Sequence, residues 1–436
     1  MLGLELARVP RAKRGVAGAI VLLGLASCDP ALSPLGPGVP IVAPPPPADL
    51  CVHGTLSRGT FTDLGFPAEA TPPGDHHMAV AARDSEVLVG TGDGVWRRPI
   101  DGSGGWERSG LDGRQVRYLL PILGSGYVLA ATGTYGTRSS NQLGSFHRSE
   151  DGGHSWLTGG RFTFEDIDGP HYIPMTNVVR QPGPEGDGIG VLYANVTGAS
   201  IVRSSDGGAN WEYLLGSESE NNSEFWHDGC AFHIPAWADR LDIGCRTATV
   251  GFFSWIDISS RSGPLGQGHA LVPISASLFD ETDDTAMLTS ASQRPGVVLA
   301  AHSRGVVRLS DDTWTLICPL GGKTVDNMCS ELGFRTEAPI NTIWIDPCDP
   351  SHQEFGGGGP EGSFGLYETF DDGQTMASIA VPESLNNRGT YAGAPSGAGA
   401  ENFVLLTALH ADQSFGGPSL DDPSSYSVIV HNHAAQ

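Results

Sequence analysis

The stretch SSDGGANW, residues 204–211, decides the fold because closely related stretches recur along the chain. SEDGGHSW at residues 149–156 repeats the pattern Ser-x-Asp-x-Gly-x-x-Trp, and TFDDGQTM at 369–376 is a close variant. PIDGSGGW at 99–106 and LSDDTW at 309–314 keep parts of the pattern. Self-similarity at a period of about 50 residues, with short strands in each unit, is typical of propellers.

Each repeat of the pattern falls between two β-rich runs, so we expect a hairpin turn that stabilises the sheet. The Asp would accept hydrogen bonds from backbone N–H groups of the turn, and a Gly would supply the positive φ. The Trp would pack its large ring against the sheet. The residues expected in these structural roles are Ser149, Asp151, Gly153, Trp156, Ser204, Asp206, Gly208, Trp211, Thr369, Asp371 and Gly373.

These motifs resemble the BNR or Asp-box repeat family, which includes sialidases, two-propeller xyloglucanases, sortilin-type receptors and photosystem assembly factors. The resemblance covers roughly residues 75–436. It implies an all-β propeller, most simply of seven four-stranded blades, with six or eight blades left open. It also implies that the box turn joins the third and fourth strands of a blade, on the face opposite the ligand site. Because propellers host many activities, the resemblance indicates a fold rather than a reaction.

The N-terminal residues 1–27 have the features of an export signal. A segment with three arginines and a lysine precedes the apolar core Val16–Leu25, which is shorter than the roughly 20 residues of a membrane-spanning helix. Leu25-Ala26-Ser27-Cys28 resembles the bacterial lipobox, which implies lipidation at Cys28. Secretion with Cys28 in a disulfide is the alternative. We therefore expect a lipid-anchored protein of the bacterial cell envelope, with the choice of inner or outer membrane left open.

Beyond the signal, residues 28–50 are rich in proline and predict an extended tether, and residues 51–436 would form the propeller. The cysteines beyond Cys28 are even in number, which favours disulfides in an exported protein. Their pairing stays open, although Cys230 with Cys245 and Cys318 with Cys329 are the local choices. The cysteines expected in disulfides are Cys51, Cys230, Cys245, Cys318, Cys329 and Cys348.

The formal net charge of -24 excludes a nucleic-acid partner, because such a surface repels polyanions. We expect a monomer that contacts the membrane through its lipid anchor alone and binds a glycan or an envelope protein. No metal site is expected, because the sequence holds no CxxC or HxxxH spacing. No cofactor is expected either, with Ca²⁺ at acidic loops as the alternative.

Loops expected on the face opposite the boxes, at 132–144, 161–172 and 216–229, combine polar and aromatic residues. Paired carboxylates beside aromatic rings suit a glycoside hydrolase, and a solvated acidic loop is the plain alternative. The candidate catalytic residues are Asp166, Asp168, Glu224 and Asp228. The candidate ligand-binding residues are Tyr135, Arg138, Tyr172, Trp226 and His227.

True sialidase activity is not expected, because the Arg-Ile-Pro motif of that class does not occur in the sequence. A xyloglucanase of the two-propeller class would need a chain nearly twice as long. The first hypothesis is therefore a non-catalytic envelope lipoprotein whose sialidase-like propeller binds a glycan or a protein. The alternatives are a glycoside hydrolase acting on a neutral sugar and an assembly factor for a membrane complex.

Overall fold

The computed structural model divides the chain into two units, Met1–Val42 and Ala43–Gln436, and every described residue belongs to the second. The structure describes residues 60–72, 79–83, 85–122, 126–133, 145–161, 163–166, 169–172, 175–181, 189–196, 200–215, 231–234, 239–246, 251–260, 272–273, 289–294, 297–302, 305–310, 313–317, 340–345, 351–358, 364–371, 377–383, 388–395, 402–409 and 422–432. Within these ranges there is no helix long and apolar enough to cross a membrane.

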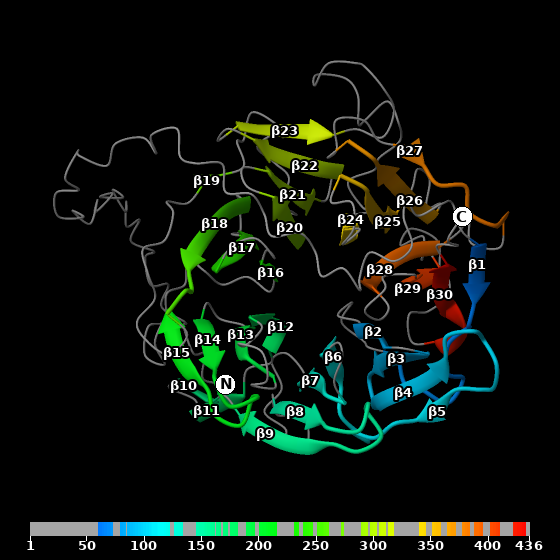
Figure 1. Ribbon diagram of the computed structural model, residues 1–436. Coiled ribbons are helices and arrows are strands. Elements are labelled where there is room, and N and C mark those ends of the chain that lie inside the picture. Colours follow the sequence, from blue (N-terminus) through cyan, green and yellow to red (C-terminus); the bar gives the residue numbers. More distant parts are fainter. Residues whose placement is uncertain are drawn as a thin grey trace, which may run out of the picture. The chain divides into compact units, whose positions relative to one another are not determined.

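The described strands form seven four-stranded antiparallel sheets and one two-stranded sheet (Figure 1). In six of the four-stranded sheets the strands are consecutive in sequence, and we call these sheets blades one to six. Blade one contains β2 (Ala79–Arg83), β3 (Glu86–Thr91), β4 (Gly94–Pro99) and β5 (Glu107–Arg108); blade two contains β6 (Val116–Pro121), β7 (Val128–Thr132), β8 (Ser145–Ser149) and β9 (Leu157–Arg161). Blade three contains β12 (Met175–Gln181), β13 (Val191–Val196), β14 (Ser200–Ser204) and β15 (Glu212–Leu215); blade four contains β16 (Ala231–His233), β17 (Arg240–Arg246), β18 (Gly251–Asp257) and β19 (Val272–Pro273). Blade five contains β20 (Thr289–Arg294), β21 (Val297–His302), β22 (Gly305–Ser310) and β23 (Thr313–Ile317); blade six contains β24 (Ile340–Ile345), β25 (Gln353–Gly358), β26 (Phe364–Thr369) and β27 (Ala377–Ser378).

Blade seven joins the two ends of the described chain. It contains β28 (Arg388–Pro395), β29 (Asn402–Leu409) and β30 (Tyr426–Asn432), and its fourth strand is β1 (Thr60–Asp63). β1 pairs antiparallel with β30, from Thr60 opposite Asn432 to Asp63 opposite Ile429. The 3₁₀ turn η7 (Pro423–Ser425) directly precedes β30, with Asp422 as its N-cap. An N-terminal strand therefore completes the last blade and covers an edge that would otherwise be open.

The first strands of the blades contact one another in sequence around a closed circuit, β2–β6–β12–β16–β20–β24–β28 and back to β2. Figure 1 shows the resulting ring, in which each sheet extends outward from its first strand. The all-β propeller predicted from the sequence is confirmed.

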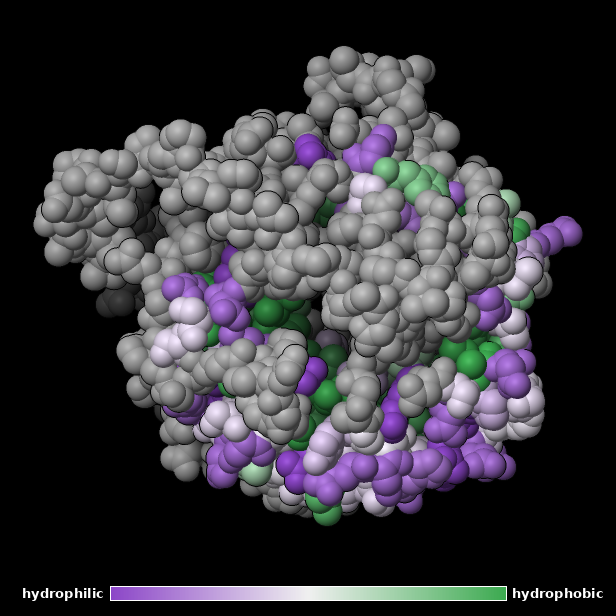
Figure 2. Space-filling view, in the orientation of Figure 1, coloured by the Kyte–Doolittle hydropathy of each residue, from purple (hydrophilic) through white to green (hydrophobic). Residues whose placement is uncertain are grey.

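The core lies between neighbouring blades. The inner strands carry nearly continuous apolar runs, such as Ala79–Ala82 and Val128–Ala131, because both faces of each sheet are covered. Apolar clusters fill the interfaces between blades seven and one, one and two, two and three, and three and four. In Figure 2 hydrophilic side chains cover the outer strands of blades one and two, and hydrophobic ones lie deeper.

The turns that carry the repeated motif all follow the third strand of a blade. Ser149 ends β8, Ser204 ends β14 and Thr369 ends β26, and the fourth strand begins after each turn. Because the sheets are antiparallel, these turns share one face of the ring, which we call the box face. We call the other end of the strands the opposite face.

Candidate functional site

Two of the sequence-predicted site residues lie on a two-stranded hairpin between blades two and three. Asp166 ends β10 (Thr163–Asp166) and Tyr172 ends β11 (Gly169–Tyr172), with Thr163 opposite Tyr172 and Asp166 opposite Gly169. The hairpin follows the end of β9, so by strand order it starts from the opposite face. Figure 1 draws it beside β9 and β15. Asp168, Glu224, Asp228, Tyr135, Arg138, Trp226 and His227 lie outside the described residues.

The lipidation and disulfide predictions stay predictions. Cys245 lies in β17. The other predicted cysteines lie outside the described residues, namely Cys28, Cys51, Cys230, Cys318, Cys329 and Cys348.

The Asp206 turn uses its polar groups in local hydrogen bonds. Ser204 Oγ donates to Asp206 Oδ1 over 2.8 Å and accepts from the Gly208 N–H over 2.8 Å. Asp206 also accepts from the backbone and side-chain amides of Asn210, at 2.9 and 2.7 Å. Partial burial would raise the pKa of Asp206, but the hydrogen bonds from Asn210 and Ser204 hold it below its ordinary value. The carboxylate therefore serves the turn as an acceptor.

The Asp151 turn has the same arrangement. Ser149 Oγ donates to Asp151 Oδ1 and accepts from the Gly153 N–H, and Ser155 donates to both carboxylate oxygens of Asp151. Partial burial opposes ionisation, yet the hydrogen bonds from Ser155 and Ser149 lower the pKa of Asp151 to about 2. The Trp156 N–H donates to the Ser109 carbonyl over 2.6 Å, which ties the turn to blade one.

In blade six the turn begins in the same way, because Thr369 Oγ1 donates to Asp371 Oδ1 over 2.8 Å. Gly373 lies outside the described residues. The three turns place their aspartates in scaffold roles on the box face, away from the hairpin that carries Asp166 and Tyr172.

The longest connections between described strands leave from the opposite face. In an antiparallel blade, this face holds the links from second to third strand and from one blade to the next. Those links include residues 133–144, 216–230, 274–288, 318–339 and 410–425. Most links on the box face are shorter, as between β20 and β21 or β22 and β23, although 258–271 is an exception. The long connections are therefore concentrated at one end of the ring.

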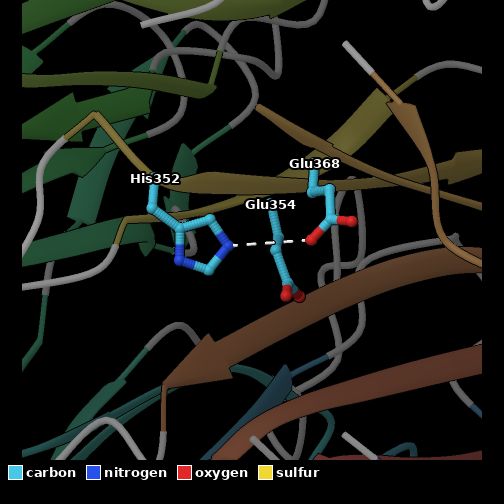
Figure 3. A group of neighbouring side chains, drawn as sticks. All are labelled: His352, Glu354 and Glu368. Atoms are coloured by element: carbon cyan, nitrogen blue, oxygen red, sulfur yellow. Dashed lines mark ion pairs between the residues drawn. The ribbon is translucent and has the colours of Figure 1, made fainter. Parts of the chain in front are cut away.

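A buried cluster that the sequence did not predict lies between blades six and seven. His352 directly precedes β25, Glu354 lies in β25, and Glu368 is the direct cross-strand partner of Glu354 in β26. Figure 3 shows the three side chains converging, with the His352 ring facing the Glu368 carboxylate. We call His352, Glu354 and Glu368 the blade-six cluster.

The donor atoms of the blade-six cluster lie close together. One nitrogen or carboxylate oxygen from each residue lies within 4.8 Å of the others, and His352 Nε2 is 3.8 Å from Glu368 Oε2. His431 of β30 approaches from blade seven, with Nδ1 3.1 Å from Glu354 Oε2. The cluster and its histidine neighbour therefore connect the last two blades of the ring.

The blade-six cluster is shielded from water. His352 and Glu368 are 3% exposed, and Glu354 and His431 are 1% exposed. The ring of Phe370 stacks on His352 at 4.3 Å between centroids, and Phe61 of β1 stacks on His431 at 4.5 Å. Phe370 itself is 52% exposed, so the cluster lies one aromatic ring below the surface of the box face.

A sequence signal for this cluster exists, although it is short. His352-Gln353-Glu354 is an H-x-E pattern at the start of a strand, and residues two apart on a strand point to the same face. The spacings CxxC and HxxxH are typical of metal ligands on turns and helices. A search for these spacings therefore does not detect metal ligands that lie on strands. Glu368 becomes visible only once the register of β25 and β26 is known.

Comparison with known proteins establishes the fold and no family. No protein-family model and no curated protein matches the sequence. A solved structure of YCF48 bound to D1 peptide is similar, with 12% identity, a TM-score of 0.51, and coverage of 87% of this chain and 96% of that chain. The GH74 xyloglucanase from Xanthomonas campestris has 13% identity and a TM-score of 0.53, over 83% of this chain and 55% of that chain. A chain of the mitotic checkpoint complex has 11% identity and a TM-score of 0.50, over 88% of this chain and 94% of that chain. At such identities the likeness shows that the chain is a β-propeller.

Proposed function

We propose that this protein is a non-catalytic docking module of the bacterial cell envelope, which binds a partner protein through the opposite face of its propeller. The observation that carries the proposal is the concentration of long connections at that face, including 216–230 and 318–339. Loops held on a rigid scaffold commonly carry binding residues. The ring supplies the scaffold, because β1 closes it against β30.

The similar structures support a protein partner. One of them is a YCF48 propeller with a peptide bound, and another belongs to a multi-protein checkpoint complex. For this chain, the net charge of -24 favours a partner surface that is basic or neutral. The resemblance at Leu25–Cys28 adds a lipid anchor, and the proline-rich residues 29–49 would hold the propeller away from the bilayer.

The alternative of a glycoside hydrolase needs two carboxyl groups about 5–10 Å apart where a sugar can reach them. Glu354 and Glu368 lie close enough to each other, but a sugar cannot reach them, because they are 1% and 3% exposed at an interface between blades. The hydrolase alternative therefore depends on Asp166, Asp168, Glu224 and Asp228, which the sequence analysis predicts for the opposite face.

The test uses the full-length lipidated protein, in native membranes, with an in-cell crosslinker and quantitative mass spectrometry. One variant replaces hairpin residues 163–172 with a Gly-Ser linker, and a matched control substitutes the exposed Glu150→Gln on the box face. We expect the recovered amount of a specific crosslinked partner to fall at least ten-fold in the hairpin variant and to stay at the wild-type amount in the control. Equal recovery from both variants would exclude this face as the docking surface.

A second arm separates binding from catalysis. The same purified protein is screened against a glycan array and a panel of neutral glycosides. We expect no turnover; hydrolysis that disappears in Asp168→Asn or Asp228→Asn would instead establish the glycosidase. A Cys28→Ser variant tests the anchor separately, because it should move the protein from the membrane fraction to the soluble fraction.

A further inference from the structure

We infer that the blade-six cluster is a binding site for one divalent transition-metal ion of the zinc class. His352, Glu354 and Glu368 would be the ligands, and His431 would orient Glu354 from blade seven. The inference concerns the box-face half of a blade interface, so it is independent of the partner-binding surface at the opposite face.

The donor set selects the class of ion. One imidazole nitrogen and two carboxylates suit zinc and its first-row neighbours, whereas Ca²⁺ and Mg²⁺ take six or more oxygen ligands. Bonds of about 2.0–2.2 Å separate neighbouring donors of a tetrahedral ion by roughly 3.4 Å. His352 Nε2 and Glu368 Oε2 are already 3.8 Å apart, and all three donors lie within 4.8 Å. A contraction on the order of 1 Å would bring the three donors to bonding distance of one ion, with a water molecule as the fourth ligand.

Charge makes a cation favourable at this position. Glu354 and Glu368 face each other across β25 and β26 and are almost fully buried. Two carboxylates in direct cross-strand contact repel, and burying both carries a large desolvation penalty that a bound cation offsets. A divalent ion balances both carboxylate charges in one step.

The surroundings have the features of a built metal site. His431 Nδ1 lies 3.1 Å from Glu354 Oε2, the position of an outer-shell group that orients a ligating carboxylate. Phe370 covers His352 and is half exposed, so a ring rotation would open a path for the ion. Elsewhere, as between blades one and two, side chains such as Leu88 and Val128 fill the equivalent space.

The consequence of binding would be structural. The ion joins β25 to β26, and through Glu354 and His431 it joins blade six to blade seven. His431 is also the register partner of Phe61 in the closing strand β1. Metal binding would therefore stabilise the part of the ring where the chain ends meet, in proportion to the ion concentration.

The test begins with full-length protein that has been stripped with a chelator, reloaded with ZnCl₂ and passed through a desalting column. Elemental analysis should find one zinc ion per chain, and calorimetric titration should give a single site. Thermal unfolding should move to higher temperature when zinc is added. Co²⁺ in place of zinc should give the visible spectrum of a four-coordinate ion with nitrogen and oxygen ligands.

The variants Glu354→Gln and Glu368→Gln keep the shape of the side chains and remove their charge. We expect each to lose at least 100-fold in zinc affinity and to lose the zinc-dependent thermal shift, while circular dichroism stays that of the wild type. His431→Gln should weaken binding 10- to 100-fold and leave the stoichiometry at one. Glu383→Gln, at an exposed residue that follows blade six, is the matched control and should behave as the wild type.

Two results would overturn the inference. The first is a wild-type protein that retains no zinc after desalting and gives no Co²⁺ spectrum, which would leave the cluster as a network of histidine–glutamate pairs. The second is zinc bound equally well by the wild type and both glutamine variants, which would place the ion elsewhere. If a glutamine variant fails to fold, the His431→Gln variant locates the ion, because zinc bound elsewhere would keep wild-type affinity in that variant.

Discussion

Ser427 donates a hydrogen bond to the carboxylate of Asp63, although 364 positions of sequence separate the two residues. The backbone follows the same path, since Leu64 N donates to the Val428 carbonyl over 2.8 Å and Val428 N donates to the Gly65 carbonyl over 3.0 Å. The first described strand therefore holds the last one in place. Residues from both ends also share one apolar cluster, which includes Leu64 and Val430.

Deletion of residues 60–66 should destabilise the whole ring, because it leaves the edge of β30 unpaired and removes Leu64 from its cluster. Unpaired edges also promote association. We expect a loss of about 1–2 kcal/mol or more, which for a domain of this size lowers the melting temperature by at least about 1–3 °C, and oligomers in size-exclusion chromatography. Deletion of residues 29–49 is the matched control, and a similar loss of stability from it would contradict the closing role of β1.

Gly208→Ala adds a single methyl group, but we expect it to lower the free energy of unfolding far more than an added methyl group usually does. Gly208 has φ +88°, and an added Cβ would collide with the ring of Phe146 in blade two. Gly113 has φ +70° with nothing within 4 Å of an added Cβ, so Gly113→Ala isolates the cost of the backbone conformation, about 1–2 kcal/mol. We expect Gly208→Ala to lose about 1–3 kcal/mol more than Gly113→Ala in urea unfolding. Equal losses would show that the interface between blades two and three accommodates the methyl group.

Asp206→Ala should destabilise the protein by about 1 kcal/mol and leave partner binding unchanged. The substitution removes the acceptor for the Ser204 hydroxyl and for both amides of Asn210, and the carboxylate is partly exposed, so water replaces some of these bonds. Ser205→Ala, at an exposed neighbour in the same turn, is the control. A loss of partner binding in Asp206→Ala without loss of stability would place function on the box face.

The sequence predicted the fold because the repeated motif carries local information. Ser204, Asp206 and Gly208 lie within one turn and bond mainly to one another, so their spacing is enough to predict that turn. β25 and β28 run through glycine-containing stretches, residues 353–358 and 388–395, that composition alone would assign to loops.

The blade-six cluster could not be predicted because it depends on register. His352 and Glu354 are neighbours in sequence, but Glu368 meets them only through the pairing of β25 with β26. His431 arrives from another blade, through the packing of the ring. Local spacing predicts turns well, whereas a site assembled from three strands leaves only the short H-x-E pattern of one strand in the sequence.

The stability of the protein should fall as pH rises from about 4 to about 7 because of Asp242 in blade four. Burial raises the pKa of Asp242 to about 7, although Arg240 Nε, 2.7 Å from Asp242 Oδ1, offsets part of the rise. The folded state then binds a proton that the unfolded state, with a carboxyl pKa near its ordinary 3.8, releases. The stabilising contribution of Asp242 is therefore complete below about pH 4 and is lost as the pH rises to about 7. Over this range the free energy of unfolding falls by at most about 1.4 kcal/mol per pH unit.

Asp242→Asn should remove this slope, because the amide stays neutral at every pH. Urea unfolding across the same range should show the variant gaining stability relative to the wild type as pH rises. Arg240→Gln removes the cation that lowers the pKa, so the fall in stability should extend above pH 7 in that background. If the difference between Asp242→Asn and the wild type does not change between about pH 4 and about pH 7, Asp242 is ionised in the folded protein and its pairing with Arg240 outweighs its burial.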